Sequence, residues 1–261
     1  MKGISDKFVY SYSTYHSYRN QMCQYINWCK DNGIRLKNIQ DFYNHANEWI
    51  QYGIDKGLSA YTLALRRSAF IKVFDDKTYK DFIELPPRRR ADIKRSRNDS
   101  TIFRHFNPDN NKNICLFLRS TGLRRIEVMS LTKDSLKYDE FGNPYLHIYR
   151  NTKGGKSRDS VIIGDDSTIS KVISIIESSE GDRVFPEGSF PKSTPCHRFR
   201  AEYAKALYNQ LCETRKIENP KDFVHLRKDR KNESYYRPFL KEVSKSLGHN
   251  RIDVVTQHYL Y

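Results

Sequence analysis

The sequence predicts an α+β fold that is mostly helical, in which a small helical bundle precedes a mixed domain with a small β-sheet. Three observations predict it. Apolar residues recur at three- and four-residue spacings along much of the chain, and one glycine-centred hairpin pattern interrupts them. A basic, proline-containing stretch separates two parts of different character. We therefore expect a helical domain over residues 1–85, a linker over 86–99 and a mixed domain over 100–261.

Three helices and a short fourth are expected in the first domain. Their apolar spacings and capping residues place them at Ser13–Lys30 with Ser13 as N-cap, Ile39–Tyr52, Ala60–Phe74 after a Ser59 cap, and Tyr79–Ile83. Lys and Arg residues fall between the apolar positions. The bundle therefore has a polar face that contacts either solvent or DNA.

The linker PPRRRADIKRSRND contains little that a core could bury. It is either a solvated hinge or a cationic tether that follows a phosphate backbone. For the second case, the candidate DNA-binding residues are Arg88, Arg89, Arg90, Lys94, Arg95 and Arg97.

The second domain mixes helix and strand patterns. Helices are expected at Asn110–Ser120, from near Leu123, and near Thr168–Ser178, Thr194–Lys216 and Arg237–Leu247. Strands are expected at Tyr145–Arg150 and Asp159–Gly164, joined by a glycine turn over residues 151–157. Arg124 stands at a helix start beside Ile126, Met129 and Leu131, which suit a buried face. An arginine there needs an anion, and either the Glu127 carboxylate or a phosphate could supply it.

Composition narrows the possible partners. The chain has 46 Lys and Arg against 31 Asp and Glu, a net charge of +15, which favours a polyanion such as double-stranded DNA. The five cysteines are scattered and show no metal-ligand spacing, and no glycine loop for a nucleotide is present. We therefore expect no metal and no cofactor. The apolar runs are too short for a membrane span, so we expect a cytoplasmic, nucleoid-associated protein.

Five short motifs, in order, resemble the boxes of the tyrosine recombinases, the phage-integrase family. TGLR-x-x-E-x-x-x-L at Thr121–Leu131 resembles the first arginine box, with Arg124 as its arginine. The others are Lys153 in TKGGKSR, His197 and Arg200 in HRFR, His249 in SLGH, and Tyr259 in HYL. Lys156 is a competing candidate for the role of Lys153 and is also expected to bind DNA. The resemblance implies a core-binding, SAM-like helical domain, a tyrosine-recombinase catalytic fold and the catalytic set Arg124, Lys153, His197, Arg200, His249 and Tyr259.

A second histidine–arginine pair, His225 and Arg227, competes for the box occupied by His197 and Arg200. Residues three apart share a helix face, whereas residues two apart do not, so we choose His197 and Arg200. This choice leaves an unusually long segment, Cys212–Arg237, before the SLGH motif. We expect it to form an added hairpin or a DNA-contacting loop.

The resemblance implies a site-specific DNA recombinase that works without metal or ATP. Cleaving a phosphodiester needs a nucleophile, cations on the non-bridging oxygens and a proton for the leaving oxygen. Tyr259 would form a 3'-phosphotyrosine, with Val254 and Val255 packing behind it. Arg124 and Arg200 would bind the phosphate, Lys153 would protonate the 5'-oxygen, His197 would help to deprotonate the tyrosine, and His249 would donate to the phosphate.

Family members act as homotetramers on two duplexes, with a dimer at each site, through a Holliday junction, in DNA integration or excision by mobile elements. Here only Leu260 and Tyr261 follow the nucleophile, whereas family members usually carry a longer tail that docks onto a neighbour. Two alternatives stay open. One is a type IB topoisomerase-like enzyme that relaxes DNA, and the other is a non-catalytic DNA-binding accessory protein.

Overall fold

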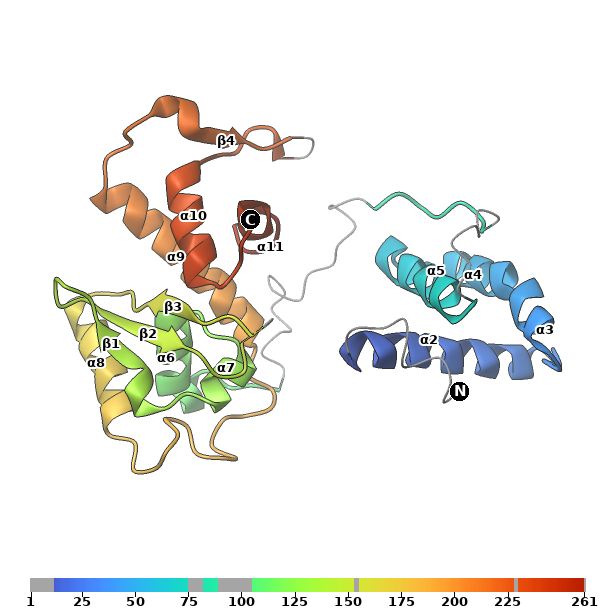
Figure 1. The fold of residues 1–261 in the computed structure, drawn as a ribbon, viewed down its shortest axis with the longest axis horizontal. Helices are drawn as coiled ribbons and strands as arrows, with labels where there is room; N and C mark the ends of the chain where they lie inside the picture. The colour runs from blue at the N-terminus through green and yellow to red at the C-terminus, as the bar shows by residue number, and fades with distance from the viewer. Residues whose placement is uncertain (1–11, 75–81, 89–104, 153–154, 228–229, 261) are drawn as a thin grey trace. The chain divides into compact units, whose positions relative to one another are not determined.

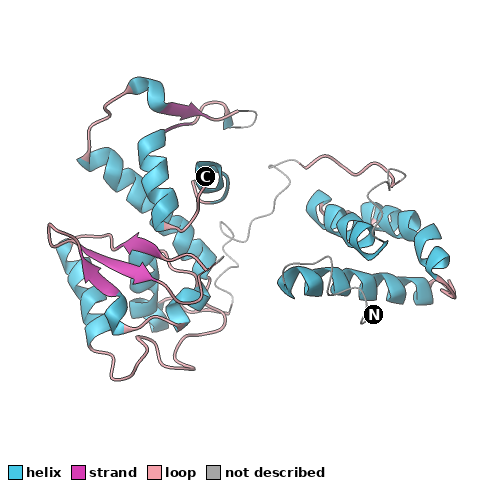
Figure 2. Cartoon of the chain, viewed as in Figure 1, coloured by secondary structure: helices cyan, strands magenta, loops and turns pink. Residues whose placement is uncertain are grey.

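The computed structural model describes residues 12–74, 82–88, 105–152, 155–227 and 230–260. The chain divides into two compact units, Met1–Lys94 and Arg95–Tyr261. Each unit is described by itself; both β-sheets belong to the second (Figure 2). Most of the expected linker lies outside the described residues, as do its candidate DNA-binding residues Arg89, Arg90, Lys94, Arg95 and Arg97.

The first unit is a bundle of helices around an aromatic core (Figure 1). Its helices are α2 (Tyr12–Asp31), α3 (Ile39–Asn44), α4 (Ala46–Asp55) and α5 (Ala60–Phe74). The Tyr25 ring is fully buried, with ring centroids 5.4 Å from Trp49 and 4.9 Å from Phe70. Its hydroxyl donates to the carbonyl of Phe42 at 2.7 Å, so no polar atom of the ring is left unsatisfied in the core.

Capping hydrogen bonds and backbone angles explain which of the expected helix boundaries are found in the structure. Ser59 caps α5 as predicted, because its Oγ accepts from the Thr62 N–H at 3.1 Å. The prediction of Ser13 as an N-cap is wrong, since Ser13 lies inside α2. The second helix is divided in two at His45, where the backbone takes φ −97° and ψ 5°.

The expected fourth helix falls partly outside the described residues, and its last two residues are not helical. Phe82 instead joins the core of the bundle as a buried side chain. The N–H of Ile83 donates to Asn47 Oδ1 at 3.2 Å, and this hydrogen bond attaches the segment at residues 82–88 to α4. A side chain from α4 thus satisfies the backbone donor that a helical turn would have used.

The second unit contains shorter and longer helices together with both β-sheets. Its elements are α6 (Lys112–Thr121), α7 (Arg125–Met129), β1 (Leu136–Tyr138), β2 (Pro144–Ile148), β3 (Arg158–Val161), α8 (Asp166–Glu177), α9 (Cys196–Thr214), β4 (Phe223–His225), β5 (Ser234–Tyr236), α10 (Arg237–Ser246) and α11 (Ile252–His258). Short 3-10 turns lie at Asp109–Asn111, Lys133–Ser135 and Pro220–Asp222. None of the helices described in either unit is long and apolar enough to cross a membrane.

The larger sheet is antiparallel in the order β1-β2-β3. Alternation along β2 turns Leu146 and Ile148 inward, into a core shared with α6 and α8. The two expected strands correspond to β2 and β3, each shorter than expected, and β1 adds a third that the sequence pattern did not indicate. The expected insertion contains a second, two-stranded antiparallel sheet, β4-β5.

The helix that follows Arg124 turns a different face inward from the one expected. Ile126 and Met129 are 54% and 40% exposed, so their predicted burial is wrong. Glu127 and Val128 are the buried residues of α7. The inward face of this short helix therefore carries a carboxylate, because Glu127 forms ion pairs with two arginines there.

A close contact fixes the end of α6 against α9. Gly122 takes the left-handed conformation with φ 59° and ends α6. A Cβ atom at this position would lie 2.3 Å from the buried ring of Tyr203 on α9, so any other residue would force the helices apart. This close approach brings Arg124 and Arg200, from separate helices, to one place.

Candidate active site

Arg200 is buried at the centre of the candidate site and is only 1% exposed. Its Nη1 donates to the Gly122 carbonyl at 2.5 Å, and its Nη2 donates to the Leu247 carbonyl. These carbonyls end α6 and α10, where helices leave acceptors unsatisfied and carry partial negative charge. Two helix ends thus solvate the guanidinium. Burial lowers the pKa of Arg200 to about 10, so it stays charged at neutral pH.

Arg124 lies beside Arg200 and shares one of its partners. It precedes α7, and its Nη2 donates to the same Leu247 carbonyl at 3.1 Å. Its Nη1 donates to Glu127 Oε1 at 2.7 Å, so the carboxylate considered from the sequence is a real partner. The side chain remains 15% exposed. Both arginines are therefore held in place by protein acceptors, and Arg124 lines a cavity open to solvent.

The buried Glu127 carboxylate links Arg124 to a third arginine, Arg158 on β3. Arg158 Nη2 donates to Glu127 Oε2 at 2.7 Å, and its Nη1 donates to the Ser246 carbonyl. Burial alone would raise the pKa of Glu127, but the charges and hydrogen bonds of Arg158 and Arg124 outweigh it and lower the pKa. Glu127 is therefore ionised and orients both guanidinium groups.

Tyr259 follows α11 and directs its hydroxyl at Arg200. The side chain is 6% exposed, and Arg200 Nε donates to the hydroxyl oxygen at 3.3 Å. His249 Nε2 lies 3.3 Å from the same oxygen and 3.5 Å from Arg200 Nη2. Since Arg200 can only donate, this geometry lets the phenolic proton point toward the imidazole nitrogen.

The backbone of the SLGH turn holds His249. Gly248 takes φ 67°, and the N–H of His249 donates to the Ser244 carbonyl at 2.8 Å. The Ser244 hydroxyl in turn donates to the His249 carbonyl at 2.8 Å. Turning the chain here puts the imidazole next to the nucleophile candidate rather than on the outside of α10.

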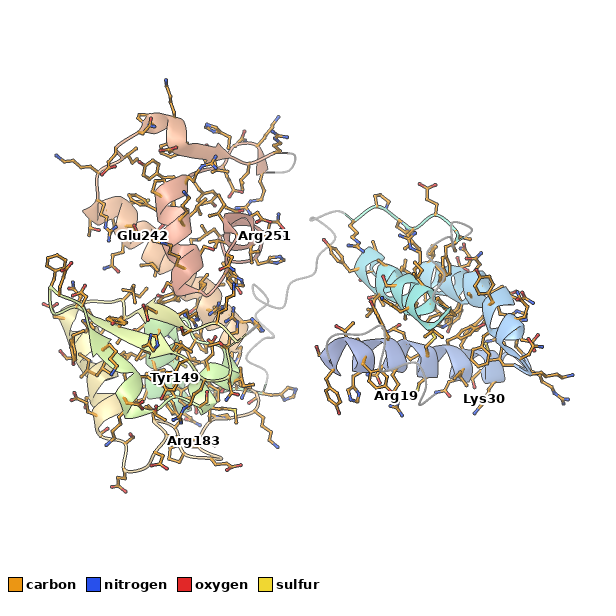
Figure 3. The ribbon with its side chains drawn as sticks, viewed as in Figure 1. Arg19, Lys30, Tyr149, Arg183, Glu242 and Arg251 are labelled. Atoms are coloured by element: carbon orange, nitrogen blue, oxygen red, sulfur yellow. The ribbon has the colours of Figure 1, made fainter. Side chains whose placement is uncertain are left out.

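A cavity of about 690 Å³ opens beside these residues. Its lining includes the cationic side chains of Arg124, Lys156, Lys245 and Arg251, and among the lining residues only Asp159 is acidic. Arg251, labelled in Figure 3, precedes α11 and forms an ion pair with Asp253 at 2.5 Å. A cavity of this size and charge suits a phosphate group with its flanking sugars.

The structure brings four of the six proposed catalytic residues together: Arg124, Arg200, His249 and Tyr259. His197 lies in the first turn of α9 with an exposed side chain, although Arg200, three residues later, is buried. Lys153 lies outside the described residues. Of the proposed DNA-binding residues, Lys156 lines the cavity, and the exposed Arg88 places its guanidinium 5.2 Å from the centre of the Tyr61 ring.

The sequence reasoning missed Arg158, although it named Glu127 as a possible partner of Arg124. The sequence pattern did not indicate Arg158, because Arg158 and Ser160 occupy the inward face of β3 whereas the apolar Val161 lies on the exposed face. An arginine on a buried face needs an acid. Glu127 is that acid, 31 residues away in the sequence.

Comparison of the coordinates with solved structures identifies the architecture. The Tn1549 transposon integrase, in complex with transposon right end DNA, gives a TM-score of 0.51 at 15% sequence identity, covering 100% of this chain and 93% of that chain. The XerH site-specific recombinase, in its post-cleavage complex with palindromic difH substrate, gives 0.52 at 15% identity, covering 93% and 75%. The sequence matches no family model and no curated protein. The chain has the fold of the tyrosine recombinases.

Proposed function

We propose that this chain is a site-specific DNA recombinase that cleaves and rejoins strands through Tyr259. The observation that carries the proposal is the placement of the Tyr259 hydroxyl, 3.3 Å from both Arg200 Nε and His249 Nε2. The fold likeness supports it, since the two similar structures are a transposon integrase and a site-specific recombinase, each with DNA. The net charge of +15 suits the same partner.

In the proposed reaction, the Tyr259 oxygen attacks a backbone phosphorus and the bond to the 5'-oxygen breaks. The phenolic proton passes to a histidine. His249 is in contact with the hydroxyl in this arrangement, and His197 remains a second proposed participant. Arg124 and Arg200 neutralise the non-bridging oxygens, which gain charge in the transition state. Attack by another strand's 5'-hydroxyl on the 3'-phosphotyrosine reverses the step and needs no ATP.

The departing 5'-oxygen requires a proton from a cation near the cavity. Lys153 is our proposed donor from the family resemblance, and Lys156, which lines the cavity, is the competing candidate. We propose double-stranded DNA as the substrate and a homotetramer, with a dimer on each duplex, as the active assembly. The strands would then exchange through a Holliday junction. A cytoplasmic, nucleoid-associated enzyme of a mobile genetic element fits this activity.

The decisive test is a covalent adduct. The wild-type protein would be incubated with genomic DNA, denatured, and its covalently attached DNA sequenced to locate the cleavage site. A nicked duplex carrying that site, which traps the cleaved strand, should then give a covalent adduct with wild type and with a Tyr261→Phe control. Tyr259→Phe should still bind the duplex and give no adduct.

Three outcomes would overturn the assignment. An adduct that persists in Tyr259→Phe would assign the nucleophile to another residue. Relaxation of supercoiled plasmids that lack the site would indicate topoisomerase-like activity. Tight binding by wild type without any adduct would indicate a non-catalytic accessory protein.

A further inference from the structure

The β4-β5 hairpin follows α9 and precedes α10 in the sequence, and it lies beside the start of α10 (Figure 1). Phe223, Val224 and Tyr235 pack against the core that these helices share with α11. The N–H of Tyr236 donates to the buried Tyr208 hydroxyl on α9 at 2.7 Å. The two strands of the hairpin are therefore a fixed part of this unit, and the described residues 230–233 before β5 can hold a side chain in a defined position.

Arg230, in that connecting segment, is fixed by an acid of the same hairpin. Its Nε donates to Glu233 Oε1 at 2.5 Å, and its Nη2 donates to the second carboxylate oxygen and, at 3.1 Å, to the Tyr235 hydroxyl. The hydrogen bond to Glu233 raises the pKa of Arg230, so its charge is permanent. The bidentate pair fixes the plane of the guanidinium.

The guanidinium of Arg230 also contacts the segment that carries the proposed nucleophile. Nη1 donates to the Thr256 carbonyl at 2.5 Å, and Nη2 donates to the Leu260 carbonyl. Thr256 precedes Tyr259 by three residues, and Leu260 follows it directly. Arg230 thus binds the backbone on both sides of Tyr259.

One of these two carbonyls, that of Thr256, is where the end of α11 needs a donor. The Val255 carbonyl already accepts from the N–H groups of Tyr259 and Leu260. The Thr256 carbonyl belongs to the last turn, whose acceptors lack partners within the helix and carry partial negative charge. An arginine at a helix C-terminus satisfies both needs. A helix of seven residues has few hydrogen bonds of its own, so the contact with Arg230 stabilises its last turn.

We propose that Arg230 is a positioning residue for strand cleavage: by capping α11, it fixes the Tyr259 hydroxyl against Arg200 and His249. The inference rests on the proposed function and assigns a role to the inserted hairpin. Misplacing a reacting group by about 1 Å can reduce a rate by about 10²-fold. Loss of the Arg230 side chain should therefore reduce cleavage while leaving DNA binding intact, because the residue contacts the nucleophile's backbone and not the phosphate cavity.

The first test measures single-turnover cleavage of the nicked duplex by Arg230→Met, Arg230→Lys and, as a matched control, Lys231→Met. Lys231 is an exposed cation in the same segment. We expect Arg230→Met to cleave about 10- to 100-fold more slowly with nearly unchanged duplex affinity and thermal midpoint. Added guanidinium ion should restore part of the rate to Arg230→Met, and Lys231→Met should cleave like wild type.

A second measurement does not depend on cleavage. Fluorotyrosine placed at position 259 should give one sharp ¹⁹F resonance in the otherwise wild-type protein. Arg230→Met should shift or broaden it, and guanidinium ion should reverse the change. The proposal is overturned if the resonance is unchanged in Arg230→Met, or if cleavage is lost together with DNA affinity and guanidinium ion restores nothing. Absence of any adduct from wild type, with the resonance behaving as expected, would refute the proposed function alone.

Discussion

Two buried arginines, Arg66 in the first unit and Arg200 in the second, occupy very different surroundings. Arg66 is 6% exposed, lies with its guanidinium 3.9 Å from the centre of the Trp49 ring, and donates Nη1 to the Trp49 carbonyl at 3.1 Å. Its Nε has no hydrogen-bond partner among the described residues. Burial lowers the pKa of both arginines. Only Arg200 has donors directed at a tyrosine and a histidine.

The difference shows that burial and a shifted pKa do not by themselves identify a functional arginine. The partners of Arg66 are the ring and carbonyl of a single residue on the neighbouring helix, and stacking on an aromatic face is a packing role. The partners of Arg200 are Gly122, Leu247, His249 and Tyr259, and each lies at least 47 residues from Arg200 in the sequence. Convergence of distant segments that carry titratable groups is the more informative property.

The largest effect that should separate the two regions is the response to acid. Because its pKa is lowered in the folded chain, ionised Glu127 stabilises the fold above its ordinary value of 4.5, and this contribution is lost as the pH falls through the folded pKa. At pH 7, Glu127→Gln should lose about 3 to 5 kcal/mol of unfolding free energy, since it leaves Arg158 without its buried partner. The difference in unfolding free energy between Glu127→Gln and wild type should therefore become smaller as the pH falls.

Urea unfolding followed by circular dichroism from pH 7 to pH 3 measures this gap. Arg66→Met serves as the control, because Arg66 bonds to a carbonyl that does not titrate, and its difference from wild type should stay constant over the same range. A constant gap for Glu127→Gln would show that the ionised carboxylate does not stabilise the second unit.

Next in size is the effect on cleavage. Arg200→Lys keeps the charge but loses the planar set of donors, and removal of one such donor typically costs about 10² to 10³ in rate, about 2.7 to 4 kcal/mol. Arg66→Lys should leave the cleavage rate of the folded protein unchanged. Single-turnover assays on the nicked duplex compare the two directly. Equal losses would mean that Arg200, like Arg66, only supports packing.

The smallest effect concerns the packing role of Arg66. A Cβ atom at Gly53 would lie 2.4 Å from Arg66 Nη1 and 2.8 Å from Leu63 Cδ2. Gly53→Ala and Arg66→Ala should therefore couple, with the double variant losing about 0.5 to 3 kcal/mol less than the sum of the single variants. The two tryptophans, Trp28 and Trp49, both lie in the first unit, so urea unfolding followed by their fluorescence reports on it. Strict additivity would rule out the contact.

Much of the fold could be predicted because local pattern determines it. The spacing of Met22, Tyr25 and Cys29 along α2 follows from amphipathic periodicity, and Ser59, three residues before a free N–H, caps α5. The pairing of β2 with β3 was also expected from the sequence. By contrast, β1 is three residues long, and a strand this short carries too little alternation to be recognised.

The site was predicted unevenly for the same reason. Arg124, Arg200, His249 and Tyr259 each stand in a short motif, so they could be proposed from the sequence, and the structure brings them together. The predicted inward face of α7 was wrong, because Arg124, which directly precedes α7, and Arg158 on β3 both bind Glu127, so that Glu127 is buried in place of Ile126 and Met129. No local sequence pattern shows that Arg158 would require Glu127 to be buried.

The sequence by itself determined the class of the fold, the strong positive charge and the residue types of the candidate site. Only the tertiary structure decided which partners hold those residues. It placed two helix-end carbonyls around Arg200, the Glu127 carboxylate between Arg124 and Arg158, and Arg230 on the backbone that flanks Tyr259. Burial, hydrogen-bond direction and charge pairing depend on what the rest of the chain brings alongside each residue, and spacing along the chain does not encode it.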